Sequence, residues 1–143
     1  MQTRRFRSIV AAVLMAGALS RMAHADPVGL WRAADGGTTR ISPCGAALCG
    51  YIVSTNPSID PATGQPMTDK NNFDPSKRNR TLVGIAVLIG MQPDGPGHWS
   101  GQLYDPSRGQ NFPGHIRELN AYTVRIEGCA LGICGGENLS RVK

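Results

Sequence analysis

The amino-acid sequence predicts an all-β fold, a single eight-stranded antiparallel barrel that follows a cleaved signal peptide. From Asp26 onward no stretch has the spacing of an amphipathic helix, and short β-like runs recur between Gly, Pro, Asp and Asn residues. Most connections between these runs are short enough for antiparallel hairpins. Closure into a barrel is expected because it removes the exposed strand edges on which proteins aggregate.

Residues 1–25 form the expected signal peptide. This segment begins with three arginines, continues with an apolar run over residues 9–19 and ends in the small-x-small sequence AHA. The apolar run has about half of the roughly 20 residues that a spanning helix needs, so we expect export and no membrane span in the mature chain. Cleavage removes four of the 15 basic residues and none of the 10 acidic ones. The nearly neutral remainder excludes a nucleic-acid partner.

The mature chain, residues 26–143, is long enough for one domain with a core and too short for two. The β-like runs place its eight strands at residues 28–34, 38–42, 49–55, 81–89, 98–104, 111–119, 122–129 and 137–142. The seventh run shows the alternation most clearly, since Tyr122, Val124 and Ile126 are separated by polar residues, as one buried and one wet face require. The fourth run is continuously apolar and rich in β-branched residues, which favours a strand covered on both faces.

The four cysteines form two pairs, each with four residues between its members. In an oxidising compartment an even number of cysteines indicates disulfides. Each pair brackets a hairpin end, and a hairpin with a four-residue loop places its flanking residues opposite each other, which predicts the local bonds Cys44–Cys49 and Cys129–Cys134. Chain entropy alone would favour crossed pairing. A four-thiolate zinc site is the alternative, whereas thioredoxin-like chemistry requires C-x-x-C, which is absent.

Several motifs carry a family resemblance. The sequence GLWR (29–32) resembles the Gly-x-Trp pattern on the first strand of lipocalins, and Arg141 occupies the position where those barrels place an arginine over the tryptophan, here Trp31. More specific is an ordered set that resembles the exported bacterial proteins called domain of unknown function 2147: Cys44…Cys49-Gly50-x-Ile52-Val53, Asp69-x-x-Asn72, Arg78-x-Arg80-x-Leu82-x-Gly84 and Gly101-x-x-Tyr104-Asp105-Pro106-x-x-Gly109. The resemblance covers essentially the whole mature chain. It implies a lipocalin-like barrel exported by a Gram-negative bacterium, to the periplasm or beyond, and implies no activity.

The polar segment 56–80 supplies most candidate ligand-binding residues. A connection of this length is uncommon in a compact domain unless it is a lid, a binding loop or disordered. We expect Asp69 and Asn72 to fix the backbone of this loop, while Arg78 or Arg80 faces the barrel mouth and binds an anionic head group. The alternative is that Asp69 pairs with one of these arginines merely to order the loop.

Tyr104 and Asp105 complete the candidate ligand-binding set. Asp105 opens the sequence DPSRG, and there an aspartate more often forms a turn than catalyses a reaction. No metal site and no cofactor is expected: the loop carboxylates lack the spacing of an EF-hand, and no His-Glu-x-x-His or Gly-x-Ser-x-Gly motif is present.

An eight-stranded barrel is either filled by its side chains or holds one small ligand. The leading interpretation is therefore a non-enzymatic barrel that binds a small apolar or amphiphilic ligand, or a cell-envelope partner, with the long loop as a lid. Two alternatives are a hydrolase or lyase that uses the polar cluster at the barrel mouth, and a filled barrel that acts as an interaction protein. An open apolar cavity, a polar cleft or a filled interior distinguishes the three.

Overall fold

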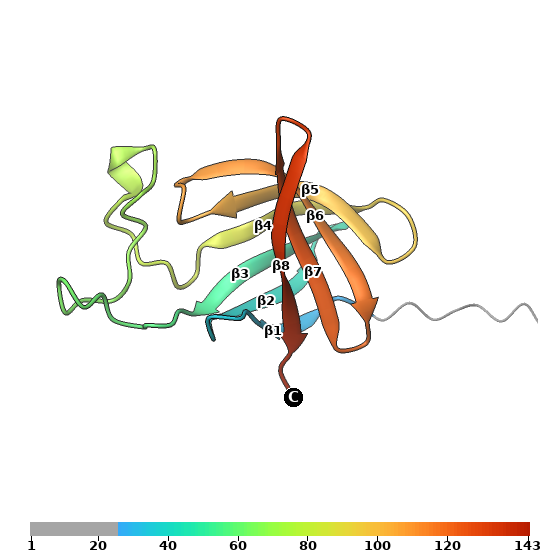
Figure 1. The fold of residues 1–143 in the computed structure, drawn as a ribbon, viewed down its shortest axis with the longest axis horizontal. Helices are drawn as coiled ribbons and strands as arrows, with labels where there is room; N and C mark the ends of the chain where they lie inside the picture. Colours follow the sequence, from blue (N-terminus) through green and yellow to red (C-terminus); the bar gives the residue numbers. More distant parts are fainter. Residues whose placement is uncertain (1–25) are drawn as a thin grey trace, which may run out of the picture.

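The computed structural model describes residues 26–143, and the expected signal peptide lies outside the described residues. The chain forms one closed barrel in which each strand pairs antiparallel with the next and β8 pairs with β1 (Figure 1). The predicted all-β, eight-stranded barrel is thus confirmed. The strands are Gly29–Arg32 (β1), Thr38–Cys44 (β2), Ala47–Ser54 (β3), Ala86–Pro93 (β4), His98–Asp105 (β5), Gln110–Asn120 (β6), Thr123–Ala130 (β7) and Ile133–Arg141 (β8).

The two ends of the barrel differ. Because consecutive strands alternate in direction, the connections that follow β1, β3, β5 and β7 share one end, and those that follow β2, β4 and β6 share the other. The hydrophobic core consists of buried side chains from β1, β2, β4, β6, β7 and β8: Trp31, Ile41, Leu88, Met91, Ile116, Val124, Ile126 and Leu139. These side chains point inward because alternate residues of a strand face the same side.

Trp31 and Arg141 lie together where the barrel closes. The two residues are partners in the β1–β8 ladder, and the Arg141 guanidinium carbon lies 4.3 Å from the indole ring centroid. The guanidinium also donates hydrogen bonds of 2.7–2.9 Å to the carbonyls of Asp26, Val28 and Ala121. These bonds connect the first strand, the last strand and the β6–β7 turn, which closes this end of the barrel.

Both predicted disulfides are present, Cys44–Cys49 in the β2–β3 hairpin and Cys129–Cys134 in the β7–β8 hairpin. The predicted four-residue loops are wrong, because strand pairing continues past the cysteines to two-residue turns. Cys129 and Cys134 face each other directly, whereas Cys49 pairs with Ser42 in the ladder and bonds to Cys44 diagonally. Such structural disulfides are typical of an oxidising, extracytoplasmic environment.

Removing the Cys44–Cys49 bond by a double Cys→Ser substitution is expected to lower the free energy of unfolding by about 2 kcal/mol. The bond joins residues only five apart, and on the chain-entropy model such a short loop restricts the unfolded chain little. Urea denaturation of the double variant and of the wild type measures the difference. Loss of cooperative folding would contradict the estimate and would assign this bond a larger role in the fold.

The fourth strand differs from its prediction. It begins at Ala86 rather than at residue 81, because Ile85 N–H donates to the Leu82 carbonyl and Gly84 has a φ of +90°, which together form a turn. The expectation that both faces of this run are covered is also wrong, since the side chains of Val83 and Ile89 are 51% and 36% exposed. A continuously apolar sequence therefore does not by itself identify a strand buried on both faces.

The connection between β3 and β4 projects from the end of the barrel where β3 finishes and has local order of its own (Figure 1). Two isolated β-bridges, Ile59 with Pro66 and Thr68 with Thr81, divide it into two consecutive loops, and the second loop contains the short 3-10 helix Pro75–Lys77 (η1). Lys70 of the second loop donates a 2.9 Å hydrogen bond to Asp60 of the first, and this bond is the main cause of the lowered pKa of Asp60. The part of the chain that the structure describes contains no helix long and apolar enough to cross a bilayer.

Candidate functional site

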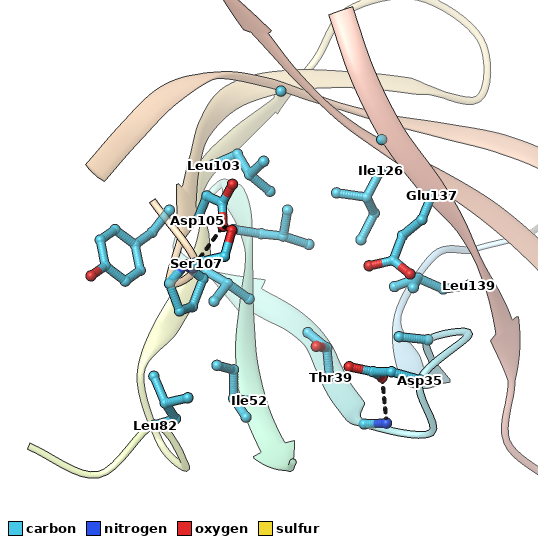
Figure 2. A pocket seen from close by; sticks show the side chains of 18 of the residues that line it. Asp35, Thr39, Ile52, Leu82, Leu103, Asp105, Ser107, Ile126, Glu137 and Leu139 are labelled. Atoms are coloured by element: carbon cyan, nitrogen blue, oxygen red, sulfur yellow. Dashed lines mark hydrogen bonds between the residues drawn. The ribbon is translucent and has the colours of Figure 1, made fainter. Parts of the chain in front are cut away.

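A cavity of about 840 Å³ opens at the end of the barrel where β1, β3, β5 and β7 finish. Its wall consists largely of apolar residues from six strands, Ile52, Val87, Leu88, Leu103, Phe112, Ile126 and Leu139. Figure 2 shows four of them around the cavity, Ile52, Leu103, Ile126 and Leu139. The volume lies within the range of about 300–1,000 Å³ that is usual for small-molecule sites. The barrel therefore has a packed floor and an open upper half.

Charged side chains border this cavity, and most of them form hydrogen bonds or ion pairs with neighbouring residues of the protein. Asp35 accepts the backbone N–H of Gly37 at 2.8 Å, and Asp105 accepts both the N–H and the hydroxyl of Ser107, at 2.8 and 2.6 Å. Arg108 lies 3.6 Å from Asp105 and packs over Phe112, with 5.5 Å between the guanidinium carbon and the ring centroid. Asp105 is thus a turn-forming residue that also borders the cavity, as the sequence DPSRG indicated.

Glu137 differs from Asp35 and Asp105 because the described part of the protein gives its carboxylate no partner. It occupies an inward-facing position on β8 between Leu139 and Gly135, and its ladder partner is Ile126 on β7. Figure 2 shows its carboxylate directed into the space bordered by Leu103, Ile126 and Leu139. Among residues 26–143, no side chain or backbone group forms a hydrogen bond or ion pair with this carboxylate.

The other candidate residues assemble beside the cavity rather than in it. Asp69 is fully buried and receives hydrogen bonds from Tyr104 at 2.5 Å, from Asn72 at 2.7 Å and from Arg80 at 2.9 Å. Tyr104 borders the cavity, whereas neither Asp69 nor Asn72 does. This buried polar cluster joins the long loop to β5.

Arg78 and Arg80 both bind to members of this buried polar cluster. Arg80 forms an ion pair with Asp69 at 2.8 Å, and Arg78 donates to the backbone carbonyl of Asn72 at 2.7 Å. Neither arginine lines the cavity, so the expected position of a guanidinium at the barrel mouth is not observed. Burial, and secondarily the hydrogen bond to Asp69, raises the pKa of Tyr104 above its usual value. Its hydroxyl therefore remains a donor at neutral pH.

Close backbone packing holds the loop against the β5–β6 turn. Phe73 N–H donates to the Gly109 carbonyl at 3.0 Å, and the Asn71 side chain donates to the Pro106 carbonyl at 3.3 Å. A Cβ atom at Gly109 would lie 1.8 Å from the Asn71 carbonyl oxygen, and φ at Gly109 is +69°. Only glycine fits this contact. These contacts hold loop residues 69–73 against a turn that itself borders the cavity.

Sequence reasoning missed three charged residues that border the cavity, Asp35, Arg108 and Glu137. A signal was available for Glu137: it lies two residues before Leu139, so strand alternation gives both side chains the same face. Asp35 and Arg108 belong to turns, and turns carry no such periodicity. The part of the chain that the structure describes contains no group of three histidines, cysteines or acidic residues placed to hold a metal ion.

An up-and-down barrel of eight strands, closed at one end and open to an apolar cavity at the other, defines a lipocalin-like protein. The chain belongs to the DUF2147 family, described as uncharacterised proteins conserved in bacteria, whose model matches residues 29–141. A similar solved structure is that of protein HP1028 from the human pathogen Helicobacter pylori, described as belonging to the lipocalin family. Its TM-score is 0.68 at 15% sequence identity, over 83% of this chain and 84% of that one. No curated protein matches the chain.

Proposed function

We propose that this protein is an exported carrier or sensor that binds one small apolar or amphiphilic molecule inside the barrel. The observation that supports the proposal most directly is the open cavity of about 840 Å³ with its predominantly apolar wall. Burial of an apolar ligand there removes its surface from water, at about 25 cal/mol per Å². The two disulfides and the signal-like N-terminal sequence support a location in the periplasm or outside the cell.

The enzymatic alternative has less support from the same geometry. A hydrolase or lyase built on Asp69 needs a carboxylate that reaches the substrate, but Asp69 is 0% exposed and its oxygens already accept hydrogen bonds from Asn72, Arg80 and Tyr104. Because the members of this cluster use their hydrogen-bonding groups on one another, the cluster is better suited to a structural role than to catalysis. The open cavity favours ligand binding over a barrel filled by side chains.

Native mass spectrometry of the protein purified after export by a Gram-negative host tests this function. We expect a non-covalent adduct of a few hundred daltons on the intact, doubly disulfide-bonded chain, because a cavity of this size holds one small molecule. The absence of any adduct, together with no measurable binding of n-decanol as a neutral amphiphilic probe, would contradict the proposal.

Filling the cavity by Gly135→Phe is expected to abolish n-decanol binding and to change the free energy of unfolding by less than about 1 kcal/mol. Gly135 faces inward opposite Gly128, and a Cβ atom there would have no neighbour within 4 Å, so the phenyl ring enters open space rather than packed core. The matched control is Asn138→Phe, which adds the same ring at an outward-facing position of β8. Isothermal titration calorimetry that finds equal n-decanol binding in both variants would place the binding site elsewhere.

A further inference from the structure

We infer that the cavity selects amphiphiles with a cationic head group, and that Glu137 is the residue that recognises the positive charge. The inference rests on the proposed function and adds the chemical class of the ligand: a protonated amine or quaternary ammonium group attached to an apolar body. It assigns the opposite charge to the ligand from the one that the loop arginines suggested. The argument begins with the position of Glu137 in the β8 strand.

Glu137 is a charged residue among inward-facing positions of β8 that otherwise hold apolar or small residues. The inward-facing residues of β8, from the floor toward the rim, are Leu139, Glu137, Gly135 and Ile133. Leu139 is buried, with 4% exposed, whereas Glu137, Gly135 and Ile133 are all exposed. The carboxylate therefore lies just above the packed floor, inside the open half of the barrel (Figure 2).

The surroundings leave room for a head group. The next inward-facing pair toward the rim is Gly135 with Gly128, and a Cβ atom at Gly135 would meet no atom within 4 Å. The missing side chain at Gly135 leaves open space next to the carboxylate, whereas Leu103 occupies the corresponding space at Gly128, 2.8 Å from where a Cβ atom would lie. An ammonium group with its substituents fits the open space at Gly135, while the side chains of Leu103, Phe112 and Ile126 border the space available to the apolar body.

The protein supplies no cation of its own to Glu137. Arg108 is the basic side chain that borders the cavity, and it contacts Asp105 and Phe112. The remaining carboxylates at the cavity, on Asp35 and Asp105, accept hydrogen bonds from neighbouring turn residues. Three carboxylates against one guanidinium give the lined volume a negative field, which attracts cations and repels anionic amphiphiles.

Glu137 is exposed to the solvent that fills the open half of the barrel, so its ion pair with a ligand cation is partly screened, while the apolar wall beside it binds the apolar body of the ligand. Glu137 therefore binds the cationic head group of the ligand, and the apolar wall binds its apolar body. A ligand that lacks either part loses one of these two interactions. A neutral ligand of the same length would leave the Glu137 carboxylate without a partner, and an anionic one would face it directly.

Three ligands of equal chain length test the inference by calorimetry below their critical micelle concentrations: n-decylammonium, n-decanol and n-decanoate. For the wild type we expect decylammonium to bind about threefold to fivefold more tightly than decanol, and decanoate more weakly than either. Glu137→Gln should remove the preference for decylammonium and leave decanol affinity unchanged. The control Asp94→Asn makes the same change in net charge in the turn between β4 and β5, at the opposite end, and should behave as the wild type.

The outcomes separate this inference from the proposed function. Equal binding of decylammonium and decanol, or an unchanged preference in Glu137→Gln, overturns the cationic specificity while leaving the cavity as an apolar binding site. Preferential binding of decanoate also overturns the cationic specificity and would indicate that a basic side chain recognises the head group. If none of the three ligands binds, the proposed function fails and the inference fails with it. Thermal unfolding of each variant checks that the barrel is folded.

Discussion

Replacing Trp31 with alanine is expected to lower the free energy of unfolding by about 3–5 kcal/mol, the usual cost of removing a large aromatic side chain from a core. Trp31 is a fully buried member of the hydrophobic cluster, its indole N–H donates to the Pro27 carbonyl at 2.7 Å, and Arg141 packs on its ring. The substitution therefore opens a void and removes the surface on which the closing arginine rests. Urea denaturation followed by far-ultraviolet circular dichroism measures the loss.

A double-mutant cycle separates the Trp31–Arg141 contact from the packing of Trp31. The single variants Trp31→Phe and Arg141→Met and their combination should give an interaction free energy of about 0.5–2 kcal/mol, the range for a cation–π contact. The guanidinium also binds three backbone carbonyls, so Arg141→Met alone should cost more than the coupling. A coupling of zero would mean that Arg141 closes the barrel through its carbonyl contacts alone.

Replacing Asp69 with alanine is expected to lower the free energy of unfolding by about 2–4 kcal/mol. A buried ion pair that loses one partner usually costs about 3–5 kcal/mol, and we take a smaller value because the Arg80 side chain is 41% exposed and regains water. Asn72 and Tyr104, both buried, would lose the acceptor that orients them. Chemical denaturation measures the loss of stability.

Hydrogen exchange locates the effect of Asp69→Ala. We expect faster exchange at the Phe73 and Leu82 amides, which hold the loop in place through Gly109 and Met67, and unchanged exchange in β7. The control is Lys77→Ala in the same loop, which breaks an exposed 3.7 Å ion pair with Asp74 and should cost less than about 1 kcal/mol. A uniform increase of exchange across the barrel would mean that the cluster supports the whole fold, not the loop alone.

The strand pattern was readable in the sequence because it is local. Alternation at Val124 and Ile126 reflects one buried and one exposed face, and the turn residues mark where strands end. The local disulfides followed from the same hairpins, since proximity along the chain places Cys129 close to Cys134 in any such pairing. Strand bounds were less accurate, as residues 81–85 show: their apolar character is that of a strand, but they form a turn ahead of β4.

The sequence by itself determined the barrel class, the number of strands, the local disulfides and the candidate polar residues, because each follows from periodicity, composition or spacing along the chain. The tertiary structure alone decided what those polar residues do. Arg80 forms an ion pair with Asp69 once the loop folds against β5, whereas Glu137, which faces the cavity opposite Ile126, meets no basic side chain from another segment of the described chain. Which charges are paired depends on segments distant in sequence meeting in space, and no local pattern in the sequence shows that meeting.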